Sequence, residues 1–212
     1  MVSPMLKSHL PRLSKKHSSF CLLYFFILIP AISQTPKEQL QLAVSDIKSI
    51  KSNFVQTKHY RFLNNDMVTT GTFYYSKPAK MKWHQKSPTE YSLILNDGII
   101  QIEDGVKQKQ VDSGKNKIGF KMNKLILSLI NGSILNDPNF HIEIANEIDQ
   151  IIVQLIGKVK AQNFEKITLT FAQKSFYLLS MKIDEGQGDY SLIEFRDHKI
   201  NTNISKEEFD IN

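Results

Sequence analysis

The feature that most constrains this chain is a succession of short segments in which apolar and polar residues alternate. Met81 and Trp83 alternate with charged or polar neighbours, and residues 91–95 repeat the pattern. Such alternation is typical of β-strands with one buried face. Asn96-Asp97-Gly98 and Asp104-Gly105 are typical of tight turns between antiparallel neighbours. The chain is therefore expected to build a sheet largely from hairpins.

The same signals continue toward the C-terminus and predict a mainly β fold (α+β) of about ten or eleven strands. Regular short strands joined by local turns favour a curved antiparallel sheet or an incomplete barrel. The predicted strands are residues 50–57, 69–76, 81–84, 91–95, 100–102, 140–145, 151–156, 167–171, 177–183, 190–195 and 209–211.

Two helices interrupt this pattern. Residues 35–49 predict an amphipathic helix, with Thr35 as N-cap, Pro36 as the first helical residue and Glu38 completing a capping box. A short and very apolar helix is predicted at residues 122–132, ending in an Asn-Gly pair that can serve as its C-cap.

The first 33 residues have the pattern of a secretory signal peptide. Four basic residues and no acidic residue accompany an apolar run at residues 20–32, which ends in small residues at Ala31 and Ser33. The run is shorter than the roughly 20 residues that a membrane helix needs. We expect cleavage after Ser33, which leaves residues 34–212 as a single domain. The alternative is an uncleaved N-terminal anchor.

Composition argues against several functional classes. The only cysteine, Cys21, lies in the signal, so the domain has no disulfide and no lipid-acceptor cysteine follows the apolar run. Beyond residue 33 the chain has 23 basic and 21 acidic residues, a net charge of +2, which gives no support for nucleic acid binding. Phosphate loops, nucleophile elbows and paired metal ligands are absent from the sequence. We therefore expect neither an enzyme nor a bound metal or cofactor.

The apolar residues of the sheet have two possible roles. A sheet that curls around a helix can enclose its own side chains or a ligand cavity. The alternating pattern identifies which residues face inward, but it does not distinguish a filled interior from a hollow one.

Three stretches of the sequence resemble the LolA-type periplasmic carriers of outer-membrane lipoproteins. They are residues 50–56, the series Gly71-Thr72-Phe73 through Lys77-Pro78 and Met81-Lys82-Trp83 to Ser87-Pro88, and the Asn96-Asp97-Gly98 hairpin. The likeness covers about residues 36–105. Two features depart from the family: Ile50 replaces an aromatic residue, and the C-terminus lacks the family's proline-containing end.

The resemblance implies an incomplete antiparallel barrel, closed by the N-terminal helix and a mid-chain lid helix around an apolar cavity. It implies a monomeric periplasmic carrier or chaperone of a Gram-negative-type bacterium. Such a carrier binds the acyl chains of lipoproteins released by an inner-membrane ABC-type complex and delivers them to an outer-membrane acceptor. The alternatives are a carrier or sensor of another lipid on the same fold, or a structural or interaction domain without a ligand.

The resemblance also assigns expected roles to individual residues. Met81 and Trp83 match cavity-wall positions of the family. Lys77 occupies the position of a basic residue, an arginine in well-known members, that holds the lid through backbone carbonyls; the alternative is a solvated lysine at a strand end. The remaining candidates for the cavity wall are Phe54, Tyr91, Leu93 and Leu95 from strands, and Leu40, Val44, Ile47, Leu125, Ile126 and Leu129 from the helices.

Overall fold

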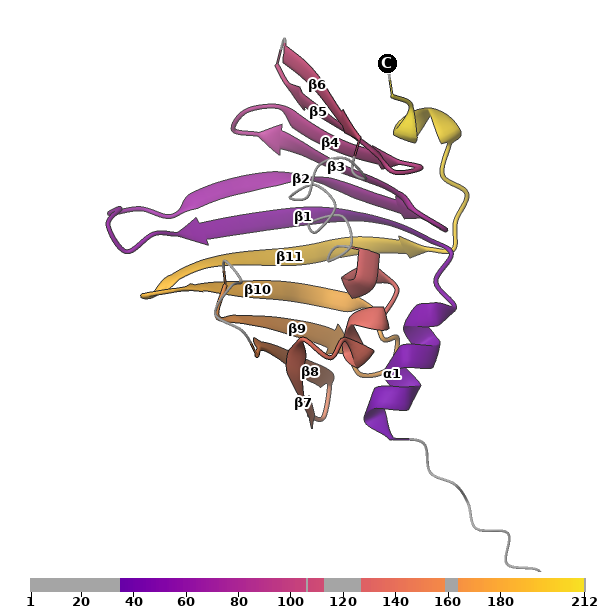
Figure 1. The fold of residues 1–212 in the computed structure, drawn as a ribbon, viewed down its shortest axis with the longest axis vertical. Helices are drawn as coiled ribbons and strands as arrows, with labels where there is room; N and C mark the ends of the chain where they lie inside the picture. The colour runs from indigo at the N-terminus through magenta and orange to yellow at the C-terminus, as the bar shows by residue number, and fades with distance from the viewer. Residues whose placement is uncertain (1–34, 106, 113–126, 159–163, 212) are drawn as a thin grey trace, which may run out of the picture. The chain divides into compact units, whose positions relative to one another are not determined.

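The computed structural model describes residues 35–105, 107–112, 127–158 and 164–211, within a compact unit that spans Gln34–Asn212. Its main element is one eleven-stranded antiparallel sheet (Figure 1). The strands are β1 Ser49–His59, β2 Met67–Ser76, β3 Lys80–Ser87, β4 Tyr91–Asn96, β5 Ile99–Asp104, β6 Lys107–Asp112, β7 Phe140–Asn146, β8 Gln150–Gly157, β9 Lys166–Ala172, β10 Leu178–Gly186 and β11 Asp189–Ile200.

The sheet consists of two meanders joined through their first and last strands. Its order is β6-β5-β4-β3-β2-β1-β11-β10-β9-β8-β7. Among the strands that the structure describes, the pairing of β1 with β11 is therefore the only one between strands distant in sequence. The outermost strands, β6 and β7, do not pair with each other in the described sheet, so the sheet is not closed. The predicted fold class, an incomplete antiparallel barrel with few helices, is confirmed.

Local turn chemistry accounts for the hairpins. In the β4–β5 turn, Asp97 and Gly98 both have positive φ, 46° and 88°. This is the backbone of a type I′ turn, whose twist suits adjacent antiparallel strands. The β10–β11 turn uses positive φ at Gln187 and Gly188 in the same way. The Asn96-Asp97-Gly98 signal in the sequence thus located the β4–β5 hairpin correctly.

Helix α1 (Pro36–Ser45) begins as predicted. The Thr35 side chain accepts a hydrogen bond from the Glu38 amide, and the Glu38 carboxylate accepts one from the Thr35 amide. The helix ends at Ser45, earlier than the predicted Ser49, because Ser49 already belongs to β1. The apolar face of the helix buries Leu40 and Val44.

The inner face of the sheet carries two apolar clusters. One combines Leu40 and Val44 of α1 with β7–β9, and the other gathers residues of β1–β5 and β11. A helical turn at residues 127–130 contributes to both clusters, and the 3₁₀ helix η1 (Ser133–Asn136) contributes to the first. The turn ends at Gly132, whose φ is 75°, as expected for a helix C-cap. Residues 122–126 of the predicted helix lie outside the described part of the chain.

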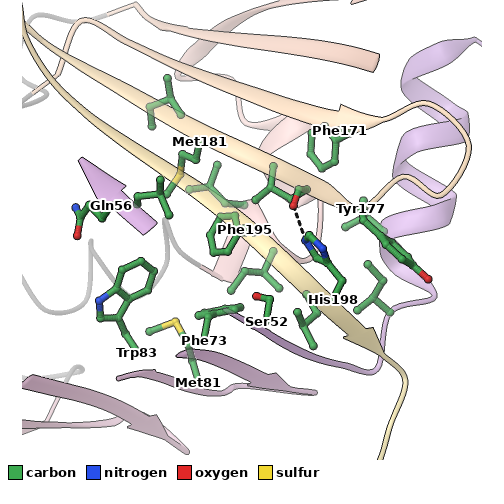
Figure 2. Close-up of a pocket in the computed structure, with 18 of the residues that line it drawn as sticks. Ser52, Gln56, Phe73, Met81, Trp83, Phe171, Tyr177, Met181, Phe195 and His198 are labelled. Atoms are coloured by element: carbon green, nitrogen blue, oxygen red, sulfur yellow. Dashed lines mark hydrogen bonds between the residues drawn. The ribbon is translucent and has the colours of Figure 1, made fainter. Parts of the chain in front are cut away.

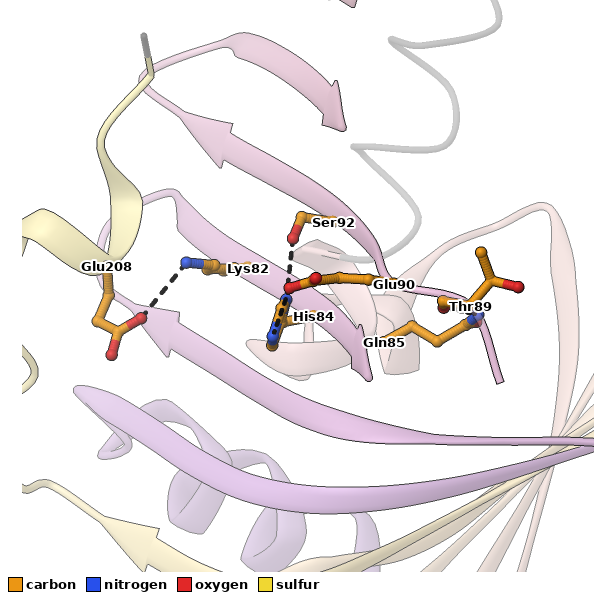
Figure 3. Close-up of polar contacts among 7 residues, drawn as sticks. All are labelled: Lys82, His84, Gln85, Thr89, Glu90, Ser92 and Glu208. Carbon is orange, nitrogen blue, oxygen red and sulfur yellow. Dashed lines mark hydrogen bonds and ion pairs between the residues drawn. The ribbon is translucent and has the colours of Figure 1, made fainter. Parts of the chain in front are cut away.

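The C-terminal segment differs from its prediction. The expected strand at residues 209–211 is wrong, because residues 206–209 form the 3₁₀ helix η2 (Lys206–Phe209) against β3 and β4. Phe209 is buried there and its carbonyl oxygen accepts a hydrogen bond from Asn96 Nδ2 at 3.0 Å. Figure 3 shows the ion pair beside it, between Lys82 Nζ and Glu208 Oε2 at 3.4 Å. Side-chain anchoring replaces strand pairing in this segment.

We predict that Gly71→Ala destabilises the fold by about 1–3 kcal/mol, the usual cost of overpacking. A Cβ at this position would lie 2.1 Å from the His84 carbonyl oxygen and 2.7 Å from the Phe54 ring. Chemical denaturation measures the effect. The exposed neighbour Thr70 provides the control, since Thr70→Ala is expected to change the free energy of unfolding by no more than about 0.5 kcal/mol. Equal effects of the two substitutions would contradict the close approach.

A second prediction concerns Tyr75, which is 1% exposed. Burial raises the pKa of its phenol above the ordinary value of 10.0. The unfolded chain therefore loses this proton before the folded chain does, and the contribution to stability is lost as pH rises above about 10. Chemical denaturation of the wild type and of Tyr75→Phe from pH 8 to 11 measures this. As the pH rises, the free energy of unfolding of the wild type should fall relative to that of the variant. A difference independent of pH would contradict the prediction.

Candidate functional site

The inner face of the sheet is hollow between its two apolar clusters. A cavity of about 450 Å³ opens there, lined by residues of α1, β1–β4, β9–β11 and the helical turn at residues 127–130 (Figure 2). Its volume falls in the range of roughly 300–1,000 Å³ found for sites that enclose small ligands. The interior is therefore partly filled and partly open, and the open part is suited to an apolar guest.

Alternation along the strands produces the apolar wall. On β3, Met81 and Trp83 point into the cavity, whereas Lys82 and His84 point to the opposite face. The Trp83 ring stacks on Phe54, with ring centroids 3.7 Å apart. Further aromatic contacts continue the wall, since Phe73 meets Trp83 at 6.3 Å and Phe195 edge-on at 5.9 Å. These contacting rings give the cavity a continuous apolar side.

A bulge in β11 decides which of its residues enter the cavity. The register with β1 shifts between Lys51 and Asn53, so β11 has one extra residue opposite Ser52, and Asp197 there has a φ of 55°. Asn53 Nδ2 donates to Asp197 Oδ2 at 2.8 Å and fixes the bulge on the outer face. Uninterrupted alternation from Phe195 would turn Asp197 and Lys199 inward. The extra residue turns His198 and Ile200 inward instead.

Four polar side chains of β1 and β11 reach the cavity. Gln56 Nε2 donates to Ser191 Oγ at 2.8 Å, and His198 Nε2 donates to the Leu178 carbonyl oxygen at 2.8 Å. Lys58 and Ser52 are the other two. The phenol of Tyr91 also lies on the wall, and burial, with a further contribution from Asp104, raises its pKa above the ordinary value. Tyr91 is therefore neutral at physiological pH.

Seven of the twelve residues predicted for the wall line this cavity. They are Val44, Ile47, Met81, Trp83, Tyr91, Leu93 and Leu129. Three others, Leu40, Phe54 and Leu95, are buried in the apolar clusters behind the wall and do not line it. Leu125 and Ile126 lie outside the described residues.

The prediction missed the C-terminal half of the wall. The missed apolar residues include Ile167, Phe171, Leu178, Met181, Ile183, Ile193, Phe195 and Ile200, together with Ile50 and Phe73 from the first two strands. Alternation in residues 178–183 and 190–195 marks their inward faces. It does not indicate that β11 pairs with β1 and so brings these faces to the same cavity.

Lys77 is the first residue of the β2–β3 connection and bonds to the C-terminal end of α1. Its Nζ donates to the Ser45 carbonyl oxygen, one of the carbonyls that a helix leaves without an internal partner. Asn201 holds the next residues, since its Nδ2 donates to Asp46 O at 3.3 Å and its Oδ1 accepts from the Lys48 amide at 2.6 Å. The helix end that carries Val44 and Ile47 into the cavity is thus tied to both halves of the sheet.

A Ser–His–Glu arrangement lies outside the cavity, on the opposite face of β3 and β4. His84 Nδ1 is 2.9 Å from Ser92 Oγ, and its Nε2 is 3.7 Å from Glu90 Oε1 (Figure 3). Ser92 is only 5% exposed, so its hydroxyl is not placed to attack a substrate. We interpret the arrangement as a part-buried hydrogen-bonded pair with an exposed carboxylate beside it. Within the described ranges, no three metal-ligating side chains gather at one point, and no helix is long and apolar enough to span a membrane.

Comparison with known proteins gives consistent matches. The family model of the outer membrane lipoprotein carrier protein LolA matches residues 45–212. The outer-membrane lipoprotein carrier protein of Cupriavidus taiwanensis is 26% identical over 176 residues, which cover 81% of this chain and 81% of that protein.

Two solved structures resemble the chain at lower identity. A chain in the complex of Pseudomonas aeruginosa MucA/MucB is 12% identical with a TM-score of 0.51, covering 82% of this chain and 59% of that one. A LolA superfamily protein from Nitrosomonas europaea is 10% identical with a TM-score of 0.44, covering 84% and 99%. The likeness to the P. aeruginosa chain shows a shared fold and nothing further.

We predict that Lys77→Met loosens the end of α1. The thioether removes the donor to Ser45 but keeps a side chain of similar length, so amide exchange at Asp46 and Ile47 should accelerate by about two- to tenfold, the range for one lost hydrogen bond. Hydrogen–deuterium exchange measures this. Lys77→Arg retains a donor and should exchange like the wild type, as should Lys86→Met at an exposed lysine. Unchanged exchange in Lys77→Met would contradict the role of this bond.

Proposed function

This chain belongs to the LolA family, and on that basis, together with its apolar cavity, we propose that it is a periplasmic carrier of lipoproteins. In this proposal the cavity binds the acyl chains of lipoproteins released from the inner membrane and carries them to the outer membrane. The observation that carries the proposal is the hollow inner face, whose wall is almost wholly aliphatic and aromatic.

The free energy of such binding is large. Each methylene that leaves water for an apolar site contributes about 0.8 kcal/mol. The acyl chains of a lipoprotein would therefore be held too firmly for release, unless loading also disrupts contacts that stabilise the unloaded protein. A carrier needs an empty state that is itself well packed, so that the guest must displace internal contacts.

In our proposal, the contacts among the clustered apolar side chains are the internal contacts that the guest must displace. The cavity volume of about 450 Å³ lies in the lower half of the range for ligand sites, so a guest with several chains requires the wall to widen. Helix α1 packs across the inner face, and its end is held by Lys77 and Asn201. We propose that outward movement of α1 admits the chains and that its return favours their release. Lys77 is then a latch on α1.

The remaining parts of the proposal concern partners. A donor complex at the inner membrane of the ABC type and an acceptor at the outer membrane are inferred from family membership. The protein is proposed to act as a monomer without a cofactor and without catalysis. Residues 1–33 are proposed to be its cleavable export signal.

We predict that Trp83→Glu abolishes binding of a fluorescent diacylated lipopeptide, lowering affinity at least tenfold. A carboxylate in the apolar wall would have to lose its hydration to allow a chain beside it. Titration followed by fluorescence anisotropy measures the affinity. The matched control is Ile148→Glu, because Ile148 is 94% exposed on the surface, and this variant should bind like the wild type.

A second variant separates loss of binding from loss of folding. Ile183→Trp fills the cavity without introducing a charge, so it should remain folded by circular dichroism and bind the lipopeptide weakly. Full binding by a folded Trp83→Glu protein together with full binding by Ile183→Trp would show that the cavity does not take the acyl chains.

A further inference from the structure

Among the described residues of the cavity wall, one buried side-chain polar atom has no hydrogen-bond partner, and a purely hydrocarbon guest would not supply one. Ser52 lies on β1, is 2% exposed and lines the cavity. Its Oγ has no hydrogen-bond partner among the described residues, unlike Gln56 and His198, whose nitrogens donate to Ser191 and to the Leu178 carbonyl oxygen. A hydroxyl buried without a partner is costly and uncommon, so an unpaired one in a ligand site points to a partner on the ligand.

The surroundings of Ser52 define what that partner can be. Its neighbours across the two ladders are Phe73 on β2 and, through the bulge, His198 on β11. Figure 2 shows Ser52 among Phe73, Phe195 and His198. The aromatic side chains give no compensation for a buried anion, and the His198 Nε2 proton is already used by Leu178. The site is therefore suited to a neutral acceptor, which takes the one free proton of Ser52.

An acyl ester offers such an acceptor in its carbonyl oxygen. A hydrocarbon tail would leave the Ser52 hydroxyl unpaired. A phosphate or carboxylate at Ser52 would be desolvated without a neighbouring cation, because Lys58, the lysine on the cavity wall, lies six residues further along β1, about 20 Å away in an extended strand. In the empty protein the Ser52 oxygen is closed off from solvent. Its contact with a guest then requires the neighbouring side chains to part, which agrees with a wall that widens on loading.

We propose that Ser52 is a carbonyl-binding residue that fixes the ester end of an acyl chain at the β11 bulge. This inference rests on the proposed function and deepens it, because it makes the cavity selective for acyl esters over equally long alkyl ethers. The bulge serves this site by setting the ring of His198, rather than the carboxylate of Asp197, opposite Ser52. A carboxylate at that position would compete for the hydroxyl and repel the carbonyl oxygen.

A matched pair of ligands tests the proposal. One is a lipopeptide with two palmitoyl ester chains on a glyceryl-cysteine, and the other is its diether analogue, which has the same chains and no ester carbonyl. The wild-type protein should bind the ester about three- to tenfold more tightly, the range for one uncharged hydrogen bond. Ser52→Ala should bind the two ligands equally. Its affinity for the ester should be lower than that of the wild type, and its affinity for the ether should be unchanged.

Stability measurements and a control variant exclude a merely structural role. Ser52→Ala should leave the thermal midpoint of the empty protein unchanged or raise it, because it removes an unpaired polar group. Thr69→Val also removes a buried hydroxyl without a partner, but Thr69 does not line the cavity, so this variant should keep the ester preference.

The outcomes separate the two proposals. Failure of the wild type to bind either ligand would overturn the proposed function. Equal binding of ester and ether by the wild type, or an ester preference that persists in Ser52→Ala, would overturn the role of Ser52 and leave the carrier function standing. A lower thermal midpoint in Ser52→Ala with an unchanged preference would assign the hydroxyl to the fold.

Discussion

The antiparallel ladder between β1 and β11 is the interaction on which the rest of the structure depends. Every other pairing in the described sheet joins neighbours in sequence, whereas this one brings the two ends of the domain together in the middle of the sheet. It places the inner faces of the two meanders over one space, so that Trp83 from the first half and Met181 from the second line the same cavity. Without this ladder the chain would have two small sheets and no enclosed site.

The register of that ladder also sets the chemistry of the cavity. A single extra residue at the bulge turns Asp197 and Lys199 to the outside and brings His198 and Ile200 inward. The inner wall thereby stays almost free of charge, which an apolar guest requires. Asn201, the residue after β11, holds the end of α1. The cavity wall and helix α1, the element proposed to move, are therefore held by the same part of the sheet.

Sequence patterns predicted the local parts of this structure well. The Thr35 cap and the Asp97-Gly98 turn depend on residues within a few positions of one another, and both are present. The tail at residues 206–209 was not predictable in this way, because Phe209 is anchored by Asn96, 113 residues earlier. The wrong assignment of a strand there reflects a preference for β structure that a distant contact overrides.

The candidate site was predictable only where local alternation determines it, and not where it depends on contacts between residues distant in sequence. Alternation identifies Met81 and Trp83 as inward-facing, but it identifies Phe54 equally, and only the fold shows that the Trp83 ring covers Phe54. His198 lines the cavity because of the bulge in β11, which no local pattern in the sequence predicts.

Native mass spectrometry of the protein purified from its native cells tests the central claim most directly. The account predicts a fraction of molecules carrying a bound species whose mass corresponds to an acylated molecule, and loss of that species in Trp83→Glu. A wild-type protein found only at its own mass, which also stays free when the diacylated lipopeptide is added, would contradict a cavity that holds acyl chains.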